Sequence, residues 1–261
     1  MGNLFVVIVL IFVLLSDYGM SATIGERFHE DTSHTWKQVL KDVVTPKPAM
    51  PPQFKEYKGS KTALPKPIFK GITVEEALVK RRSIRDYVDK PLSLQEVSQL
   101  AFAAQGITGK LYGTHLRTAP SAGALYPFEI YLIVNNVSAI KRGIYHYSPL
   151  DHSIVLIKEG DFRKELMQAS LSQEMMKDAG IVIVLSAIFD RMRSKYGERG
   201  YRYVYMEAGY ISQNIYLQAT SLGLGSVVVG AFIDKDINNL IGVDGKKEAV
   251  IALHAVGAIK K

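Results

Sequence analysis

One long stretch of the sequence constrains the fold more than any other. If residues Tyr201 to Leu222 form a helix, apolar side chains lie on nearly every face of it, and Gly223 follows as a residue that ends helices. A helix that is apolar all round is buried, either in a large core or at an interface between subunits. A chain of 261 residues is long enough to supply such a core. We therefore expect a substantial globular domain built around this helix.

Composition narrows the chemistry that the domain can perform. The sequence contains no cysteine, which excludes disulfides, thiolate nucleophiles, iron–sulfur clusters and cysteine-ligated zinc. The histidines include no pair at the spacing of an H-E-x-x-H metal site. We predict that no metal is bound and that a redox enzyme built from this chain needs an organic cofactor.

The net charge of +7 raises nucleic acid as a partner. Lysine and arginine are scattered, however, and no basic run interleaved with aromatic residues marks a binding groove. A phosphorylated cofactor would also use part of the excess positive charge. We therefore predict no nucleic-acid interface.

The N-terminal residues have the features of a targeting segment. Leu4 to Leu15 is an unbroken apolar run, followed by small residues around 19–22. The run suits a signal-peptide core and is shorter than the roughly 20 residues of a spanning helix, but no lysine or arginine precedes it. We interpret residues 1–21 as an export signal or a membrane anchor. A buried start of a cytoplasmic protein is the alternative.

Residues 22–72 are expected to form an N-terminal arm. They are polar at first and then rich in proline, at positions 46, 48, 51, 52, 65 and 67. Proline at this spacing disfavours helix and favours an extended segment, which either wraps on a surface or serves as a linker. The compact domain is predicted over residues 73–261.

Within that domain, helices and strands mix without strict alternation. Capping boxes at Thr73–Glu76 and Ser93–Glu96 predict helices that run to the arginine pair at 81–82 and to Gly106. A short helix is expected over Asp234–Ile241. This pattern indicates an α+β fold rather than a doubly wound one. Strands are expected over Phe128–Val134, Gly143–Tyr147, Ile154–Ile157, Ile181–Ala187, Ser226–Gly230 and Glu248–Val256.

The strongest local signal is Lys80-Arg-Arg-Ser-Ile-Arg-Asp-Tyr87, where a helix gives way to an extended segment. Arg81 and Arg85 could converge on one anion, because guanidinium groups match phosphate oxygens two at a time. The alternative is a solvated basic helix end that complements the helix dipole.

A second signal is the loop Ala119-Pro-Ser-Ala-Gly-Ala-Leu-Tyr-Pro-Phe128. Its small residues would let backbone N–H groups approach a ligand closely, and Ser121 offers a hydroxyl. On its own this loop is equally well explained as a turn before a strand.

Together with three later blocks, these signals resemble the nitroreductase family and, within it, the SagB-type dehydrogenases. The resemblance covers roughly residues 28–260. It implies an α+β fold with a central mixed or antiparallel sheet flanked by helices, in an intertwined homodimer. The later blocks are Lys195–Tyr203, Glu207–Gly209 with Gln213–Asn214, and Leu222–Ser226.

The resemblance implies that the chain binds FMN. It places Arg81 on the phosphate and ribityl chain, with Arg82 and Ser83 alongside. Arg85 would face the N1/O2 edge of the flavin ring, where a cation stabilises the charge that develops on reduction.

The resemblance also implies that Pro120, Ser121, Ala122 and Gly123 contact the FMN from the second subunit. Further cofactor contacts would come from the backbone of Val228, Val229, Gly230 and Ala231 near N5, and from Lys260 at the phosphate. Ala124 and Tyr126 stand where typical nitroreductases carry asparagine and glutamine, which favours the SagB-like branch.

In azoline-oxidising members of that branch a Lys-Tyr pair is essential, and Lys195 and Tyr196 match it. A lysine in a buried, cationic setting could accept the substrate proton while a hydride leaves for the flavin. The alternative is a surface pair in a charged loop.

The function implied is hydride transfer to FMN from a small or peptide-borne heterocycle. An NAD(P)H-dependent nitro or quinone reductase is the alternative enzyme.

Overall fold

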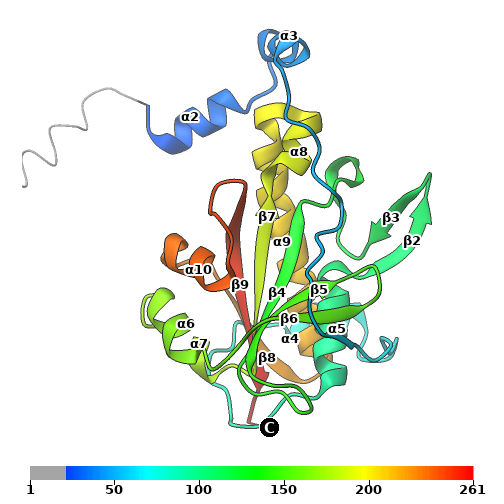
Figure 1. Cartoon of the computed structure of the whole chain (residues 1–261), viewed down its shortest axis with the longest axis vertical. Coiled ribbons are helices and arrows are strands. Elements are labelled where there is room, and N and C mark those ends of the chain that lie inside the picture. Colours follow the sequence, from blue (N-terminus) through cyan, green and yellow to red (C-terminus); the bar gives the residue numbers. More distant parts are fainter. Residues whose placement is uncertain (1–21, 261) are drawn as a thin grey trace, which may run out of the picture. The chain divides into compact units, whose positions relative to one another are not determined.

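The computed structural model describes residues 22–260 (Figure 1). The segment interpreted as a signal or anchor, residues 1–21, lies outside the described residues. Within the described range no helix is long and apolar enough to cross a membrane. The chain forms two compact units, divided after Thr45.

Two helices occupy the described part of the first unit, where we expected an extended arm. They are α2 (Ile24–Asp31) and α3 (Trp36–Val44). Thr23 and Thr35 cap their first turns by accepting backbone N–H groups. In α3 the apolar residues also recur at helical spacing. Extended backbone begins only with the prolines after Thr45.

The second unit is built on a seven-stranded sheet in the order β1-β6-β5-β4-β7-β9-β8, and every neighbouring pair is antiparallel. A separate hairpin joins β2 (Ile107–Leu111) to β3 (Thr114–Arg117). The strands of the large sheet are β1 (Lys61–Ala63), β4 (Phe128–Val134), β5 (Gly143–Ser148), β6 (Ser153–Glu159), β7 (Ile181–Ile188), β8 (Leu224–Val229) and β9 (Glu248–Ala258).

Helices cover both faces of this sheet, which confirms the α+β class. Strand alternation sends Ile130 and Leu132 of β4 into one core, with α5 (Leu94–Gln105) and α9 (Gly200–Ser221). It sends Ile133 into the opposite core. The helices of that second face are α6 (Arg163–Ala169), α7 (Met175–Asp178) and α10 (Asp234–Ile241). The remaining helices of the unit are α4 (Val74–Lys80), which contacts α9, and α8 (Phe189–Tyr196).

Helix α9 is the long apolar helix expected from the sequence, but it is not buried all round. One stripe, including Val204, Ile211 and Ile215, packs into the core. Met206 and Tyr210 lie on another stripe and are about half exposed, at 52% and 43%. The chain therefore buries one side of α9 and leaves a second apolar side uncovered.

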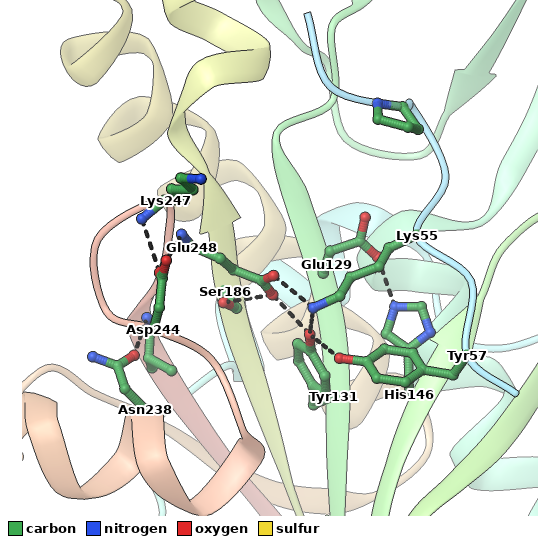
Figure 2. A network of polar contacts seen from close by, with 12 residues as sticks. Lys55, Tyr57, Glu129, Tyr131, His146, Ser186, Asn238, Asp244, Lys247 and Glu248 are labelled. Atoms are coloured by element: carbon green, nitrogen blue, oxygen red, sulfur yellow. Dashed lines mark hydrogen bonds and ion pairs between the residues drawn. The ribbon is translucent and has the colours of Figure 1, made fainter.

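Residues 46–57, which we call the strap, are held to the rest of the second unit by two buried arginines and by Lys55 of the strap itself. Arg191 Nε donates to the carbonyl of Pro52 at 2.8 Å, and Arg117 donates to the carbonyl of Gln53 at 3.2 Å. Figure 2 shows Lys55 reaching Glu248, at 2.6 Å, and Tyr131. The strap therefore packs as part of the second unit.

Candidate functional site

The basic segment 81–85 is hydrogen-bonded to strands at the β8 edge of the sheet. The N–H of Ile84 donates to Ser226 of β8, and the N–H of Val88 donates to Ala258 of β9, both at 2.9 Å. Ser83 forms a parallel bridge with Ser226. The sheet thus holds the arginines beside β8, whereas a free helix end would leave them mobile.

Tyr216 of α9 joins this segment to β8, and nothing in the sequence pointed to it. Its hydroxyl is hydrogen-bonded to Ser83 Oγ and accepts the N–H of Val228, both at 2.9 Å. The guanidinium of Arg81 lies over its ring, 5.1 Å from the centroid. His254 packs edge-on against the same ring at 4.5 Å. Tyr216 therefore sets the position of Ser83 and Arg81 relative to the strand.

The three arginines of the segment differ in what they contact. Within residues 22–260, neither Arg81 nor Arg85 forms an ion pair with a carboxylate. Arg82 instead donates to the carbonyls of Val79 and Arg81, at 2.8 and 2.7 Å, and so covers the C-terminal end of α4. The helix-end interpretation therefore describes Arg82, while Arg81 and Arg85 have charge available for an anion.

The segment at the end of β8 is only partly open to a ligand. The N–H of Val228 is taken by Tyr216, and the side chain of Val229 is buried in the core. Gly230 and Ala231 are exposed. Lys260 is also exposed and follows Ile259, which lies against Gly225 at the start of β8.

The Pro-Ser-Ala-Gly loop lies against the Lys-Tyr pair of the same chain. Gly123 has a φ of +63°, and a Cβ there would come within 2.9 Å of Lys195 Nζ and 2.8 Å of the Tyr196 hydroxyl. The positive φ favours glycine, and a larger residue here would have to displace the ends of the Lys195 and Tyr196 side chains. Ser121 Oγ accepts the N–H of Tyr126 at 2.9 Å, which closes the turn.

The Lys-Tyr pair ends helix α8 and does not lie in a loop. The Tyr196 ring packs edge-on against Tyr203 at 4.9 Å. Lys195 is exposed in the single chain. The carbonyl of Lys195 accepts from Lys47 of the strap at 3.0 Å.

Arg191, one turn before Lys195, anchors α8. Its fully buried guanidinium donates to Glu129 at 2.6 Å and to the carbonyl of Tyr126 at 3.1 Å. Burial alone would raise the pKa of Glu129, but the hydrogen bond with His146 and the charge of Arg191 outweigh it and hold the pKa below its ordinary value. The ionised Glu129 thus fixes Arg191, and Arg191 fixes both α8 and the end of the loop.

The candidate site residues therefore form two groups. One contains the basic segment, Tyr216 and the end of β8, and the other contains the loop at 120–123 and the Lys-Tyr pair. No hydrogen bond or ion pair joins the two groups in the part of the chain that the structure describes. In Figure 1, α8 and β8 lie toward opposite ends of the sheet.

Comparison with known proteins agrees with this fold. The sequence profile of the nitroreductase family matches residues 78–258. A protein of Methanocaldococcus jannaschii with a provisional nitroreductase name is 44% identical over 191 residues, which cover 73% of this chain and 93% of that protein. The microcin B17-processing protein McbC of Escherichia coli is 29% identical over 154 residues, 56% of each chain.

Two solved structures share the fold. One, from Anabaena variabilis and provisionally named a nitroreductase, has a TM-score of 0.72 at 26% identity, over 93% of this chain and 49% of that one. Another, from Desulfovibrio desulfuricans, was solved in complex with FMN. It has a TM-score of 0.52 at 19% identity, over 74% of this chain and 89% of that one. On the profile match and the 44% identical relative, the chain belongs to the nitroreductase family of flavin oxidoreductases.

Proposed function

We propose that this protein is an FMN-dependent oxidoreductase of the SagB-type dehydrogenase kind. It acts as an intertwined homodimer and oxidises a small or peptide-borne heterocycle. The observation that carries the proposal is the division of the site into two groups. The basic group has the charge to bind a phosphate and a reducible ring, and the Lys-Tyr group has the side chains for proton transfer. Within one chain the two groups do not contact each other through hydrogen bonds or ion pairs among the described residues.

The basic group fits FMN by its chemistry. Arg81 and Arg85 have no carboxylate partner among residues 22–260, so their charge is available for an anion. Arg81 would hold the phosphate and ribityl chain, and Lys260 would add a second cation at the phosphate. Arg85 would face the N1/O2 edge of the ring, and FMN would supply the two-electron acceptor that takes a hydride at N5.

A second copy of the chain would complete the site. Met206 and Tyr210 give α9 an exposed apolar stripe. Beside the helix lies an open cleft of about 720 Å³, lined by the loop 67–74, α5 and α9. Phe69 in that loop is 83% exposed. Apolar surface of this extent on a globular unit indicates an interface, and pairing there would bring the loop 120–123 of one subunit to the FMN of the other.

Lys195 and Tyr196 would then handle the substrate proton. Their Nζ and hydroxyl groups border the same glycine, Gly123, so both face one small region of the loop. As a hydride leaves one substrate atom, a base must take a proton from another. Lys195 would accept it, and the Tyr196 hydroxyl would orient the substrate or relay the proton.

The alternative is an NAD(P)H-driven reductase of nitro compounds or quinones. It is favoured by the 44% identity to the Methanocaldococcus jannaschii protein with a nitroreductase name. Both enzymes would use the same FMN site. They differ in which molecule reduces the flavin.

The two candidates are separated by the reductant. The FMN-loaded protein is mixed anaerobically with NADPH, NADH or a synthetic azoline peptide, and bleaching of the flavin absorbance is followed. We expect slow bleaching by the nucleotides and faster bleaching by the azoline peptide. Rapid bleaching by NAD(P)H, with none by the peptide, would favour the reductase.

Replacing Lys195, the proposed base, tests whether this residue acts in substrate oxidation or in FMN binding. Lys195→Ala is expected to retain FMN, because the proposal gives the Lys195 side chain no contact with the cofactor. It should lose azoline-dependent bleaching by at least the roughly 100-fold typical of a lost general base. Lys66→Ala, an exposed lysine remote in sequence, is the matched control. Unchanged bleaching in Lys195→Ala would exclude the role given to this lysine.

A further inference from the structure

A carboxyl group in the middle of α9 is buried without a hydrogen-bond partner. Glu207 is 1% exposed, and neither of its oxygens has a partner among the residues that the structure describes. Gln105 Nε2 and Arg117 Nε are also buried and unpartnered there. Unsatisfied buried polar groups are costly, and natural proteins keep them mostly where they serve a purpose.

Glu207 faces the loop at 120–123. The Ser121 hydroxyl and the Gln105 amide are the neutral polar groups near enough to influence its protonation, and Arg117 is the charged group that faces it. Ser121 Oγ already accepts the N–H of Tyr126, so its own hydroxyl proton is free to be donated. A side chain that exchanges hydrogen bonds with Ser121 would therefore hold the start of the turn.

The other charges of this region lie behind Arg117. Its guanidinium donates to Gln105 Oε1 at 2.8 Å and to the strap, and Glu129 and Arg191 act electrostatically on it. Arg191 is bound to Glu129 at 2.6 Å. The positive charge of Arg117 is thus partly balanced by Glu129.

Burial decides the ionisation of Glu207. It raises the pKa of this carboxyl to about 8, against the smaller opposing effects of Ser121, Arg117 and Gln105. At neutral pH the side chain is therefore mostly a neutral acid, which can both donate and accept a hydrogen bond.

We propose that protonated Glu207 is a positioning residue that holds Ser121, and through it keeps the turn at 121–123 against Lys195 and Tyr196. The inference rests on the proposed function, because this turn is the part that would contact the FMN of the other subunit. Loss of the proton would place a negative charge in a buried site directly behind the turn. FMN affinity should then fall as the pH rises, by at most about tenfold per pH unit, since one proton is coupled to binding.

The test is a titration of the full chain with FMN from about pH 6.5 to about pH 9.5, a range that spans the ionisation of a raised carboxyl. Quenching of FMN fluorescence gives the Kd. Glu207→Gln is the decisive variant, because it keeps the size and a neutral hydrogen-bonding group but cannot ionise. Glu207→Ala removes the carboxyl group that would hold Ser121, and far-UV circular dichroism checks that both variants fold.

We expect the wild-type Kd to be level at low pH and to rise at high pH. Glu207→Gln should lack this rise and bind like the wild type at low pH, while Glu207→Ala should bind more weakly at every pH. The same pH profile in wild type and Glu207→Gln, or equally weak binding by the Gln and Ala variants, would overturn this inference alone. No FMN binding by the wild type at any pH would overturn the proposed function, and this inference with it.

Discussion

At the scale of single residues, two buried glutamates differ in ionisation because their partners differ. Glu129 is buried but bound by Arg191 and His146, so it remains ionised. Glu207 is buried without such partners, so it holds its proton. The first arrangement anchors a helix, and the second is the basis of the coupling between the turn and pH that we propose.

The raised pKa of Glu207 also predicts how stability depends on pH. Its pKa is about 8 in the folded state, against an ordinary value of 4.5. Between those values the folded state binds more protons than the unfolded state, so the free energy of unfolding falls as the pH rises. This single group contributes a slope of up to about 1.4 kcal/mol per pH unit.

Urea denaturation at several pH values between about 5 and about 8 checks this prediction, because the slope is confined to the interval between the two pKa values. Glu207→Gln should lose the slope that Glu207 contributes. A variant with the full wild-type slope would show that the carboxyl is not protonated in the folded protein.

The residues of the site were predictable to different degrees. Arg81 and Arg85 stand in a compact motif that resembles a family pattern, and the structure leaves both without a carboxylate partner in the described chain. Tyr216 was not predicted, because nothing in the local sequence shows which strand a tyrosine of an apolar helix will contact. Glu207 was noted as part of a motif, but its role depends on burial, which the tertiary fold decides.

At the scale of elements, the strap and α8 are held by one buried charge network. Arg191 bonds the strap, the loop end and Glu129 at once. The prolines predicted an extended segment that wraps on a surface or links domains, and the structure shows it wrapped from Pro46 onward. The contacts that Arg191 makes with the strap could not be predicted, because they involve backbone carbonyl groups and depend on where the fold places an arginine that is distant in sequence.

Removing the negative charge of Glu129 should destabilise these elements. Glu129→Gln leaves Arg191 buried without its ion partner, which typically costs about 3–5 kcal/mol of unfolding free energy. Glu159→Gln is the matched control, because Glu159 pairs with Lys141 on the surface, where such pairs contribute less than about 1 kcal/mol. Urea denaturation measures both, and equal losses would contradict the structural role of Glu129.

At the scale of the whole molecule, two copies of the chain are needed to build the proposed site. The sequence indicated that α9 is apolar all round, yet one chain covers only part of it. Amphipathic patterning shows that a surface is apolar, but it does not separate the surface that packs within a subunit from the one that packs between subunits.

A charge on the exposed side of α9 should separate the subunits. Tyr210→Asp places a carboxylate on the apolar stripe, and desolvating it on association is costly. We expect a monomer in size-exclusion chromatography with light scattering, together with loss of FMN binding. Leu150→Asp is the control, because Leu150 is a similarly exposed apolar residue, at 52%, in the turn between β5 and β6. A dimeric Tyr210→Asp protein would place the interface elsewhere.

Titration of the purified full-length chain with FMN tests the proposed cofactor site most directly. Quenching of FMN fluorescence and the visible spectrum of the protein report binding, and light scattering on the same sample reports its mass. We predict a yellow dimer that binds one FMN per chain, with binding strongly weakened in Arg85→Ala. A colourless protein that takes up no added FMN would contradict the proposal.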